Sequence, residues 1–481
     1  MEYCFIDNNK PLDRISQKIV RSHAMKGKNV GRTITARGHR GRQRENEGDH
    51  TPILQPEIFS EIRNGRIILP KVSSLKSSPA ATERITLLRN PLYQTELLPE
   101  PLTSSSRYLL HEFYHVISQT LYPSIFCRQL DEAKFSWFEL MIRNPCVFHC
   151  ALGMTGAYIM TYRGHRDTSF ESIRHLVKAM SLLRHELSAT PEPQDSSFAV
   201  IISLAIHANL VKSVQECRIH LQGLKYIIES RSGGLTGLCT RIPEIGNKIR
   251  RTDIDLALSA GSLTLFGSQA SPLPATLYVM PTNERAARVS LPSPLNDTSP
   301  YLRAMARDIF ALCSYAGYTK FGAFQYQDII LSIFQRLVDF SPLNGPRPQI
   351  QLDDSCQLGL LVFMSTIVHH DPQRRSVCSL LLSETLKVRL RISDDTLLIP
   401  HANDYASYFL WLFFVYAISS PDYDSYCHDT NSSVARSVRA LLLRLEIQSW
   451  ADVKASLESY PWIPAFHGDS ARRLWEQGIC M

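Results

Sequence analysis

The chain has 481 residues, 44% of them hydrophobic and 20% charged, and a formal net charge of +7. This composition predicts a large globular protein with a well-filled core. The eleven cysteines have no regular spacing, which argues against a disulfide framework and indicates a reducing compartment. The N-terminal residues lack the apolar run of a secretory signal, so we expect no secretion.

The positive charge is concentrated near the N-terminus, in a basic arm that we place at residues 1–50. Residues 10–44 contain eleven Lys or Arg and a single acid, Asp13, which gives a net charge of +10 and leaves −3 for the rest of the chain. Apolar residues in the first half of the arm have the spacing of a short helix. Glycine and arginine dominate from Gly27 onward, where we expect disorder.

Three interpretations of the basic arm stay open: a solvated charged tail, a nuclear import signal or nucleic-acid patch, and a mitochondrial presequence, which Glu2 and Asp7 disfavour. Phosphate contact would be salt-dependent and largely independent of base sequence. Base stacking is not supported, because residues 10–44 contain no aromatic side chain. The residues that we predict for import or non-specific DNA contact are Arg21, His23, Lys26, Lys28, Arg32, Arg37, Arg40, Arg42 and Arg44.

Residues 51–106 are predicted to form a linker, because proline and serine clusters interrupt any periodicity; one short strand is expected at 66–69. From residue 107 to 481 the pattern is helical, and Pro145 is expected to open one helix and Ser449 to cap another. Six prolines in 268–300 predict a disordered interior loop. The expected helices are 107–121, 145–162, 169–186, 196–211, a helix ending at Gly233, 302–316, 324–340, 358–368, 375–390, 405–418, 434–445, 451–458 and 470–477.

The first of these helices carries the sharpest enzymatic motif, a His-Glu-x-x-His formed by His111, Glu112 and His115. This spacing places two imidazoles one helical turn apart, as zinc hydrolases require, with the glutamate as general base. On a regular helical wheel both histidines face away from the apolar side, and no third ligand stands at a usual distance. We expect no metal here and keep a zinc-dependent hydrolase as an alternative. The predicted apolar side consists of Leu109, Leu110, Phe113, Val116, Ile117 and Leu121.

Other histidines and cysteines give weaker signals. Cys146, His149 and Cys150 have the spacing of a metal set on one helix, but no second pair lies nearby, so buried helix residues are the expectation. His207 stands alone in an apolar helix and is expected in the core. Residues 369–371 are expected at a helix C-terminus, where positive charge is favourable.

The most strongly patterned stretch is 195–238, where two apolar helices follow one another. Gly233 and Gly234 are expected to close the second helix, since glycine takes positive φ without steric cost. Its pattern comprises His220, Gly223, Leu224, Ile227, Ile228, Arg231, Gly233, Gly234 and Leu235. This pattern resembles the fungal-specific transcription factor domain, the helical regulatory region that usually follows a zinc-cluster DNA-binding module.

Other segments carry the same resemblance, which covers most of 107–481. Trp137, Pro145 and 149–151 match one helical region of the family, and 410–414, 449–453, 460–462 and Trp475 match its end. Arg21, Ser22, His23 and Met25 match a short N-terminal element of the family. The resemblance implies an all-α regulatory domain that controls transcription, often of metabolic genes.

The zinc cluster itself is absent from the sequence: no Cys-x-x-Cys occurs, and only Cys4 precedes Cys127. The sequence also lacks a Gly-rich phosphate loop and a nucleophile elbow. We therefore predict no enzymatic activity, catalytic residue, metal or cofactor. The apolar run at 405–421 is shorter than the roughly 18–20 residues that span a bilayer, so a buried helix and no membrane contact are expected.

These observations together predict an all-α nuclear regulator of transcription. The helical body would contact transcription-related proteins, dimerise or sense an effector, and the basic arm would supply import and loose DNA contact. Homodimerisation is left open. A paralogue that lost its DNA-binding exon is a further alternative.

Overall fold

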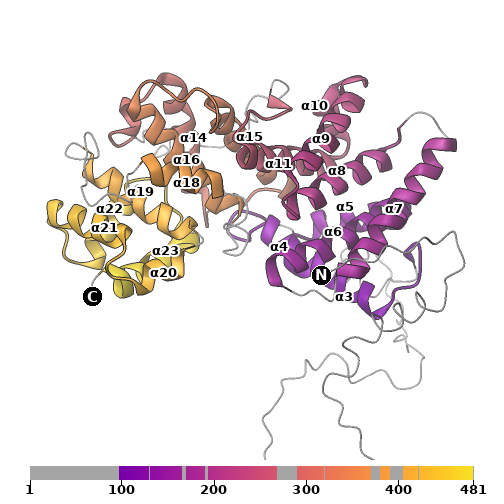
Figure 1. The fold of residues 1–481 in the computed structure, drawn as a ribbon, viewed down its shortest axis with the longest axis horizontal. Coiled ribbons are helices and arrows are strands. Elements are labelled where there is room, and N and C mark those ends of the chain that lie inside the picture. The colour runs from indigo at the N-terminus through magenta and orange to yellow at the C-terminus, as the bar shows by residue number, and fades with distance from the viewer. Residues whose placement is uncertain are drawn as a thin grey trace, which may run out of the picture. The chain divides into compact units, whose positions relative to one another are not determined.

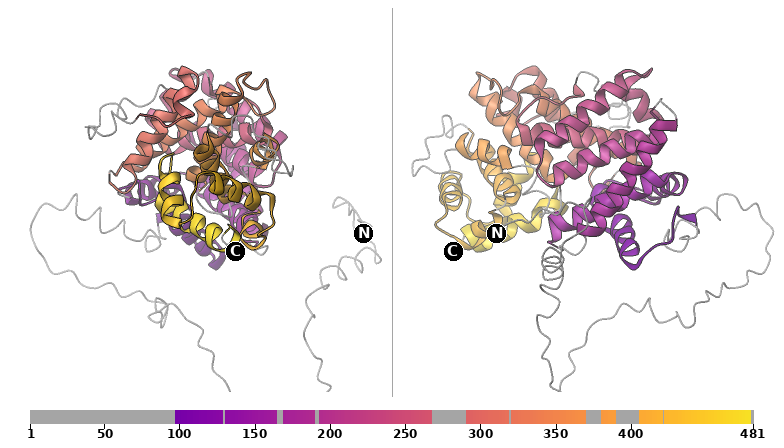
Figure 2. Two further views of the ribbon diagram at one scale, coloured as in Figure 1. Left: turned by 90° about the vertical axis from the view of Figure 1, so that its left-hand side faces the viewer. Right: turned by 45° about the vertical axis from the view of Figure 1, so that its right-hand side comes forward.

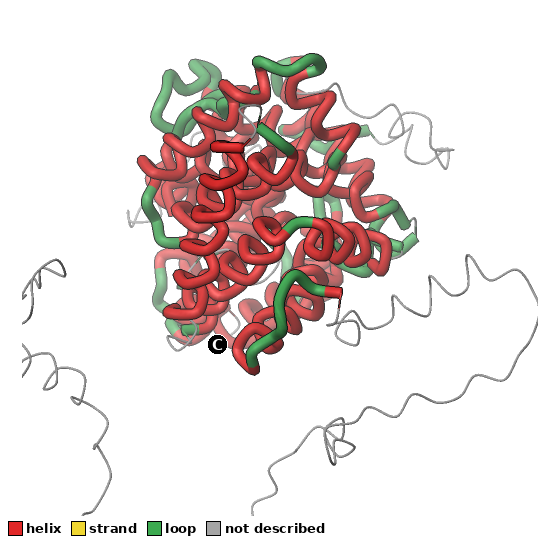
Figure 3. The backbone as a smooth tube through the Cα atoms, turned by 90° about the vertical axis from the view of Figure 1, so that its right-hand side faces the viewer, coloured by secondary structure: helices red, strands yellow, loops and turns green. Residues whose placement is uncertain are grey.

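The computed structural model describes residues 97–128, 130–164, 169–189, 193–267, 290–318, 320–369, 380–389, 405–420 and 422–479. The chain divides into two units, Met1–Ser77 and Ser78–Met481, and every described residue belongs to the second. The basic arm, the expected strand at 66–69 and most of the linker lie outside the described residues. Within them the regular elements are helices, apart from one isolated bridge between Cys127 and Phe321 (Figure 3). The all-α prediction is confirmed.

The helices before residue 261 form a continuous series (Figure 1). The first is interrupted by a π-helical turn, η3, and short connections join the others. They are α3 (Ser104–Glu112), η3 (Phe113–Ile117), α4 (Ser118–Leu121), α5 (Leu130–Arg143), α6 (Pro145–Arg163), α7 (Ser169–Ala189), α8 (Asp195–Leu210), α9 (Val214–Glu229), α10 (Gly234–Arg241) and α11 (Pro243–Ala260).

The helices after residue 289 begin with a short 3-10 turn, η6, and end with a π-helical turn, η7. Those coloured orange to yellow pack on one another in both views of Figure 2. They are η6 (Leu295–Asp297), α14 (Pro300–Tyr315), α15 (Ala323–Phe340), α16 (Gln351–Val368), α18 (Leu380–Arg389), α19 (Ala406–Ser419), α20 (Tyr423–His428), α21 (Ser433–Arg444), α22 (Trp450–Glu458), α23 (Pro464–Arg473) and η7 (Leu474–Ile479).

Local capping chemistry fixes several of these boundaries. The Asn144 side chain accepts hydrogen bonds from the backbone N–H groups of Cys146 and Val147, and Pro145 occupies the first turn of α6 as predicted. Ser449 caps α22 as predicted, because its hydroxyl accepts the N–H of Asp452. Such signals are readable because cap and helix are adjacent in sequence.

Some predicted boundaries were wrong. The predicted linker extends to residue 106, but α3 begins at Ser104, since the Thr103 side chain accepts the N–H of Ser106 and caps the helix. Of the predicted loop at 268–300, residues 268–289 lie outside the described residues, 290–299 contain the short turn η6, and α14 begins at Pro300. Gly233 has φ of 87°, as expected of a left-handed position, but α9 ends earlier, at Glu229, and Gly233 precedes α10.

Two hydrophobic cores organise the described helices, one built mainly from α3–α11 and one mainly from the helices that follow. Helix α11 contributes to both: Ile249 and Leu256 belong to the first core, Ile254 and Leu258 to the second. We did not predict α11, because its sequence is rich in charge. Arg250, Arg251, Asp253 and Asp255 are buried, and distant residues bond to them, as Gln327 does to Arg251 at 2.8 Å.

The apolar run at 405–421 forms α19, which is 14 residues long and buried among the helices of the second core. The indole N–H of Trp411 donates to the backbone oxygen of Pro461 at 2.9 Å, so the polar atom of this buried ring is satisfied. In the described part of the chain, no helix has the length and apolar character needed to cross a membrane. The predicted buried helix is confirmed.

Candidate functional site

In the His-Glu-x-x-His motif of the first helix, the glutamate is held by an arginine of another helix. Glu112 is buried, and its Oε2 atom lies 2.7 Å from the guanidinium of Arg163. A carboxylate held in this way is an ion-pair partner rather than a free general base. Among the described residues, the one group of acidic, His and Cys side chains close enough to share an ion contains neither His111 nor His115.

The predicted apolar side of this helix needs a correction. The π-helical turn η3 lets the N–H of Ser118 bond to the carbonyl of Phe113, five residues earlier, which adds one residue to the turn. As a result, the side chains after the turn are rotated about the helix axis, compared with their positions in a regular α-helix. Tyr114 is fully buried, whereas Val116 and Ile117, which a regular wheel places in the core, are only half-buried.

The sequence-predicted set on α6 is divided between two environments. Cys146 and Cys150 pack with Ala179 and Val200 in a small third cluster. Burial raises the pKa of the Cys146 thiol to about 11 and that of Cys150 to about 12, so both stay protonated at neutral pH. This confirms the expectation of buried helix residues for the two cysteines. The side chain of His149 is not part of this cluster.

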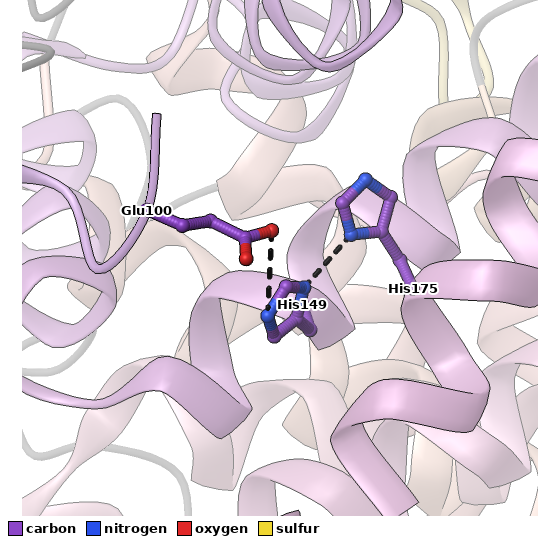
Figure 4. A group of neighbouring side chains, drawn as sticks. All are labelled: Glu100, His149 and His175. Carbon is purple, nitrogen blue, oxygen red and sulfur yellow. Dashed lines mark hydrogen bonds and ion pairs between the residues drawn. The ribbon is translucent and has the colours of Figure 1, made fainter. Parts of the chain in front are cut away.

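His149 meets a histidine that the sequence analysis did not single out. Its Nδ1 atom lies 2.8 Å from Nδ1 of His175 on α7, and its Nε2 atom lies 3.7 Å from a carboxylate oxygen of Glu100, just before α3 (Figure 4). Both histidine side chains are 1% exposed. Three separate segments therefore converge on one buried polar cluster, which we call the histidine pair site.

Further polar groups surround this pair. On the far side of His175, Nε2 lies 3.3 Å from the hydroxyl of Ser106 and 3.5 Å from a carboxylate oxygen of Glu171. The ammonium of Lys178 bonds to the carboxylate of Glu100. The histidine pair thus lies between the carboxylates of Glu100 and Glu171, and Lys178 forms an ion pair with Glu100.

Small residues on α6 allow this close approach. A Cβ atom on Gly153 would lie 2.6 Å from Cγ of Leu176, and one on Gly156 would lie 2.6 Å from Cβ of Ser172. The hydroxyl of Ser172 also donates to the carbonyl of Gly153 at 2.6 Å. Glycine at these two positions lets α7 sit close enough for His149 and His175 to touch.

The two histidines are arranged to be neutral together. Burial lowers the pKa of His149 to about 4, opposed by Glu100, and burial also lowers the pKa of His175. One consistent set of protons has Ser106 donating to His175, the Nδ1–H of His175 donating to His149, and the Nε2–H of His149 facing Glu100. Protonating both rings would turn the central bond into two opposed donors.

This geometry suits a shared proton better than a metal ion. Two imidazole nitrogens that ligate one tetrahedral zinc lie about 3.3 Å apart, with both lone pairs aimed at the ion. The two Nδ1 atoms of the histidine pair are 2.8 Å apart, at hydrogen-bond distance, and Glu100 approaches the opposite nitrogen of His149. The chemistry that the arrangement supports is structural hydrogen bonding and uptake of one proton.

The remaining predicted positions have mixed outcomes. His369 follows the last residue of α16 as predicted, and its Nε2 atom lies 3.1 Å from Asp255. His207 is half-buried rather than deep in the core. His370, Asp371 and the nine predicted residues of the basic arm lie outside the described residues.

Comparison with known proteins gives one family-model match, and it lies in the first group of helices. Residues 108–260 match the family model of the fungal specific transcription factor domain, about a third of the 481 residues. The match starts within α3 and ends with the last residue of α11. No curated protein and no solved structure matches the chain. The resemblance beyond residue 260 stays a prediction, and within 108–260 the chain is similar to the fungal specific transcription factor domain.

Proposed function

We propose that this protein is a nuclear regulator of transcription that acts through its helical body. The observation that carries the proposal is the family match over 108–260, which spans a described all-helical segment with its own hydrophobic core. The control of transcription is what this domain family implies. A nuclear location follows from the same function.

The body would act by binding other molecules rather than by catalysis. His149 and His175 are buried and hydrogen-bonded to one another, and Glu112 is held by Arg163. These are the groups with the strongest catalytic potential from the sequence and the geometry, and each already has a structural partner. Metal analysis of the purified protein tests the hydrolase alternative: zinc that is stoichiometric and lost in a His111→Ala, His115→Ala double variant would support it.

The basic arm is proposed to supply nuclear import and contact with DNA phosphates. Eleven Lys or Arg within 10–44, with a single acid, give it the charge for both roles. No zinc cluster with paired Cys-x-x-Cys spacings occurs in the sequence to read bases. Sequence-specific recognition would therefore come from a protein partner.

The test is binding of a labelled duplex DNA pool by the full chain and by a shortened chain that starts at Thr51, over a series of salt concentrations. We expect binding by the full chain alone, with affinity that falls steeply as salt rises, because released counterions drive the association. Equal binding by both chains would contradict a role for the arm. Exclusion of a fluorescent fusion from the nucleus, together with an unchanged transcriptome after gene deletion, would contradict the whole proposal.

A further inference from the structure

The loop that follows α11, residues 261–267, is held by carboxylates from two helices. The backbone N–H groups of residues 265–266 donate to the two carboxylate oxygens of Asp253 on α11, at 2.8 and 2.9 Å. The N–H of Thr264 donates to a carboxylate oxygen of Asp339 on α15 at 2.8 Å. The loop is therefore fastened to both α11 and α15, which pack against one another (Figure 1).

A hydroxyl and an amide join these two carboxylates. The hydroxyl of Thr264 donates to Oδ2 of Asp339 at 2.7 Å and accepts the side-chain N–H of Gln335 at 3.1 Å. Gln335 and Asp339 are four residues apart on α15, so their side chains project from the same face of that helix. We call the four side chains of Asp253, Thr264, Gln335 and Asp339 the loop oxygen cluster.

One oxygen of the loop oxygen cluster has no donor. Gln335 is 2% exposed, and its Oε1 atom accepts no hydrogen bond from any described residue. The Nε2 atom of the same amide is held on the Thr264 hydroxyl, which places the amide beside the carboxylate of Asp339. A buried acceptor is costly unless it meets a donor or a positive charge, so this oxygen indicates a further group at the cluster.

The negative charge of the loop oxygen cluster is not paired by a basic side chain. Burial raises the pKa of both carboxyl groups, that of Asp253 to about 7, and the charge of Asp339 adds to the effect on Asp253. Lys225 on α9 opposes it, but its ammonium bonds to the carbonyl of Leu265 and lies 3.6 Å from Glu229. In the described structure neither carboxylate forms an ion pair.

We propose that the loop oxygen cluster binds Ca²⁺ and that the ion fastens the loop and α15 to α11. Carboxylate and amide oxygens are ligands that hard cations prefer, whereas zinc sites favour nitrogen and sulfur. Asp253 and Gln335 are almost fully buried, so an ion between them must lose most of its water. Mg²⁺ loses water reluctantly, and Ca²⁺ accepts less regular geometry, so the cluster favours Ca²⁺. Asp339 is half-buried, which gives the ion access from solvent.

The position of the cluster gives the ion a structural effect. Helix α11 contributes side chains to both hydrophobic cores, and α15 belongs to the second core. An ion shared by Asp253 and Asp339 would therefore strengthen the contact between the two groups of helices. The same ion would compete with protons for these carboxylates, so its affinity should fall as the pH is lowered from 8 to 6.

Isothermal titration calorimetry of the full chain with CaCl₂ at pH 7.5, after treatment with a chelator, tests the proposal. We expect a dissociation constant on the order of 10⁻⁴ M, and binding of MgCl₂ that is weaker by roughly tenfold or more. Asp339→Asn removes one charge but keeps an oxygen for the N–H of Thr264, and it should weaken calcium binding by roughly tenfold or more. Gln335→Glu supplies a third carboxylate of the same shape and should tighten binding by a similar factor.

The matched control is Asp308→Asn, because Asp308 is also half-buried but is paired with Arg336; this variant should leave calcium affinity unchanged. Circular dichroism establishes that each variant is folded, and a gain of affinity in Gln335→Glu cannot come from loss of the fold. Added calcium should also slow hydrogen exchange at the amides of 264–266. Absence of binding at millimolar calcium, or one affinity for the natural protein, Asp339→Asn and Gln335→Glu, would overturn the proposal. An equal loss of affinity in the control variant would overturn it as well.

Discussion

The histidine pair site predicts that acid destabilises this protein through His149 in particular. The pKa of His149 is lowered from 6.5 to about 4 by burial, so between these values the unfolded chain binds a proton that the folded chain excludes. Unfolding then takes up a proton, and stability falls as the pH falls. The loss begins near pH 6.5 and is complete near pH 4, whereas above pH 6.5 the contribution of His149 is fully present.

The magnitude follows from the size of the shift. One pKa unit corresponds to about 1.4 kcal/mol, so His149 alone should cost about 2 kcal/mol on going from pH 7 to pH 5, and about 3 kcal/mol by pH 4. The charged groups that surround His149 shift its pKa in opposite directions. Glu100 favours the charged imidazole, whereas His175, Lys178 and Arg174 disfavour it.

The assay measures the free energy of unfolding in urea at pH 7 and pH 5, for the natural protein and for His149→Phe. Unfolding of the full chain is monitored by tryptophan fluorescence. The variant should be less stable at pH 7, because His175 loses its buried partner. Its further loss between pH 7 and pH 5 should be smaller than that of the natural protein by about 2 kcal/mol. His428→Ala, at an exposed position in the last turn of α20, is the control and should keep the natural pH dependence. If His149→Phe loses as much stability between the two pH values as the natural protein, the reasoning is refuted.

Two further predictions concern helix packing and a buried carboxylate. In thermal unfolding, Gly153→Ala should destabilise the protein by about 1–3 kcal/mol, because its Cβ would lie 2.6 Å from Cγ of Leu176. The matched variant is Gly223→Ala, whose Cβ meets nothing within 4 Å. It should stabilise α9 by about 0.5–1 kcal/mol. Asp253→Ala should cost about 2–3 kcal/mol and speed hydrogen exchange at 265 and 266, because Asp253 accepts both backbone N–H groups. Unchanged exchange at these two amides would count against that role.

The features that could be predicted from the sequence depend on neighbours in the chain. Asn144 and Pro145 fix the start of α6, and Ser449 fixes the start of α22, because a cap and its helix are within a few residues. The apolar run of α19 is equally local, since its composition alone requires burial. Each of these predictions is confirmed for that reason.

The features that could not be predicted depend on distant partners. The charges of α11 are typical of a solvent-facing segment, but the structure pairs them inside the protein. Arg250 bonds to Asp328, 78 positions away, and Asp255 contacts His369, 114 positions away. Likewise, η3 changes which residues of the first helix face the core, and no residue type in the sequence marks it. Helical periodicity assumes a regular turn, so it fails where the turn is not regular.

The histidine pair site illustrates the same limit for function. His149 stood out in the sequence because Cys146 and Cys150 share its helix, but the residues that it meets are His175, 26 positions later, and Glu100, which lies before α3. One signal was available: two glycines on α6, Gly153 and Gly156, mark a helix that another backbone can approach closely. That signal identifies a close contact without identifying its partner.

The close approach of α6 and α7 links the buried histidines to the rotation of α7 about its own axis. Because Gly153 and Gly156 have no side chains, the small Ser172 and the branched Leu176 fit against α6, and His175 reaches His149. The same contacts fix the rotation of α7, and a 21-residue helix with a fixed rotation must present its remaining face outward. That outward face includes the exposed apolar side chains of Phe170, Ile173 and Val177, whereas Arg174 on its edge is paired with Glu171 of the same helix.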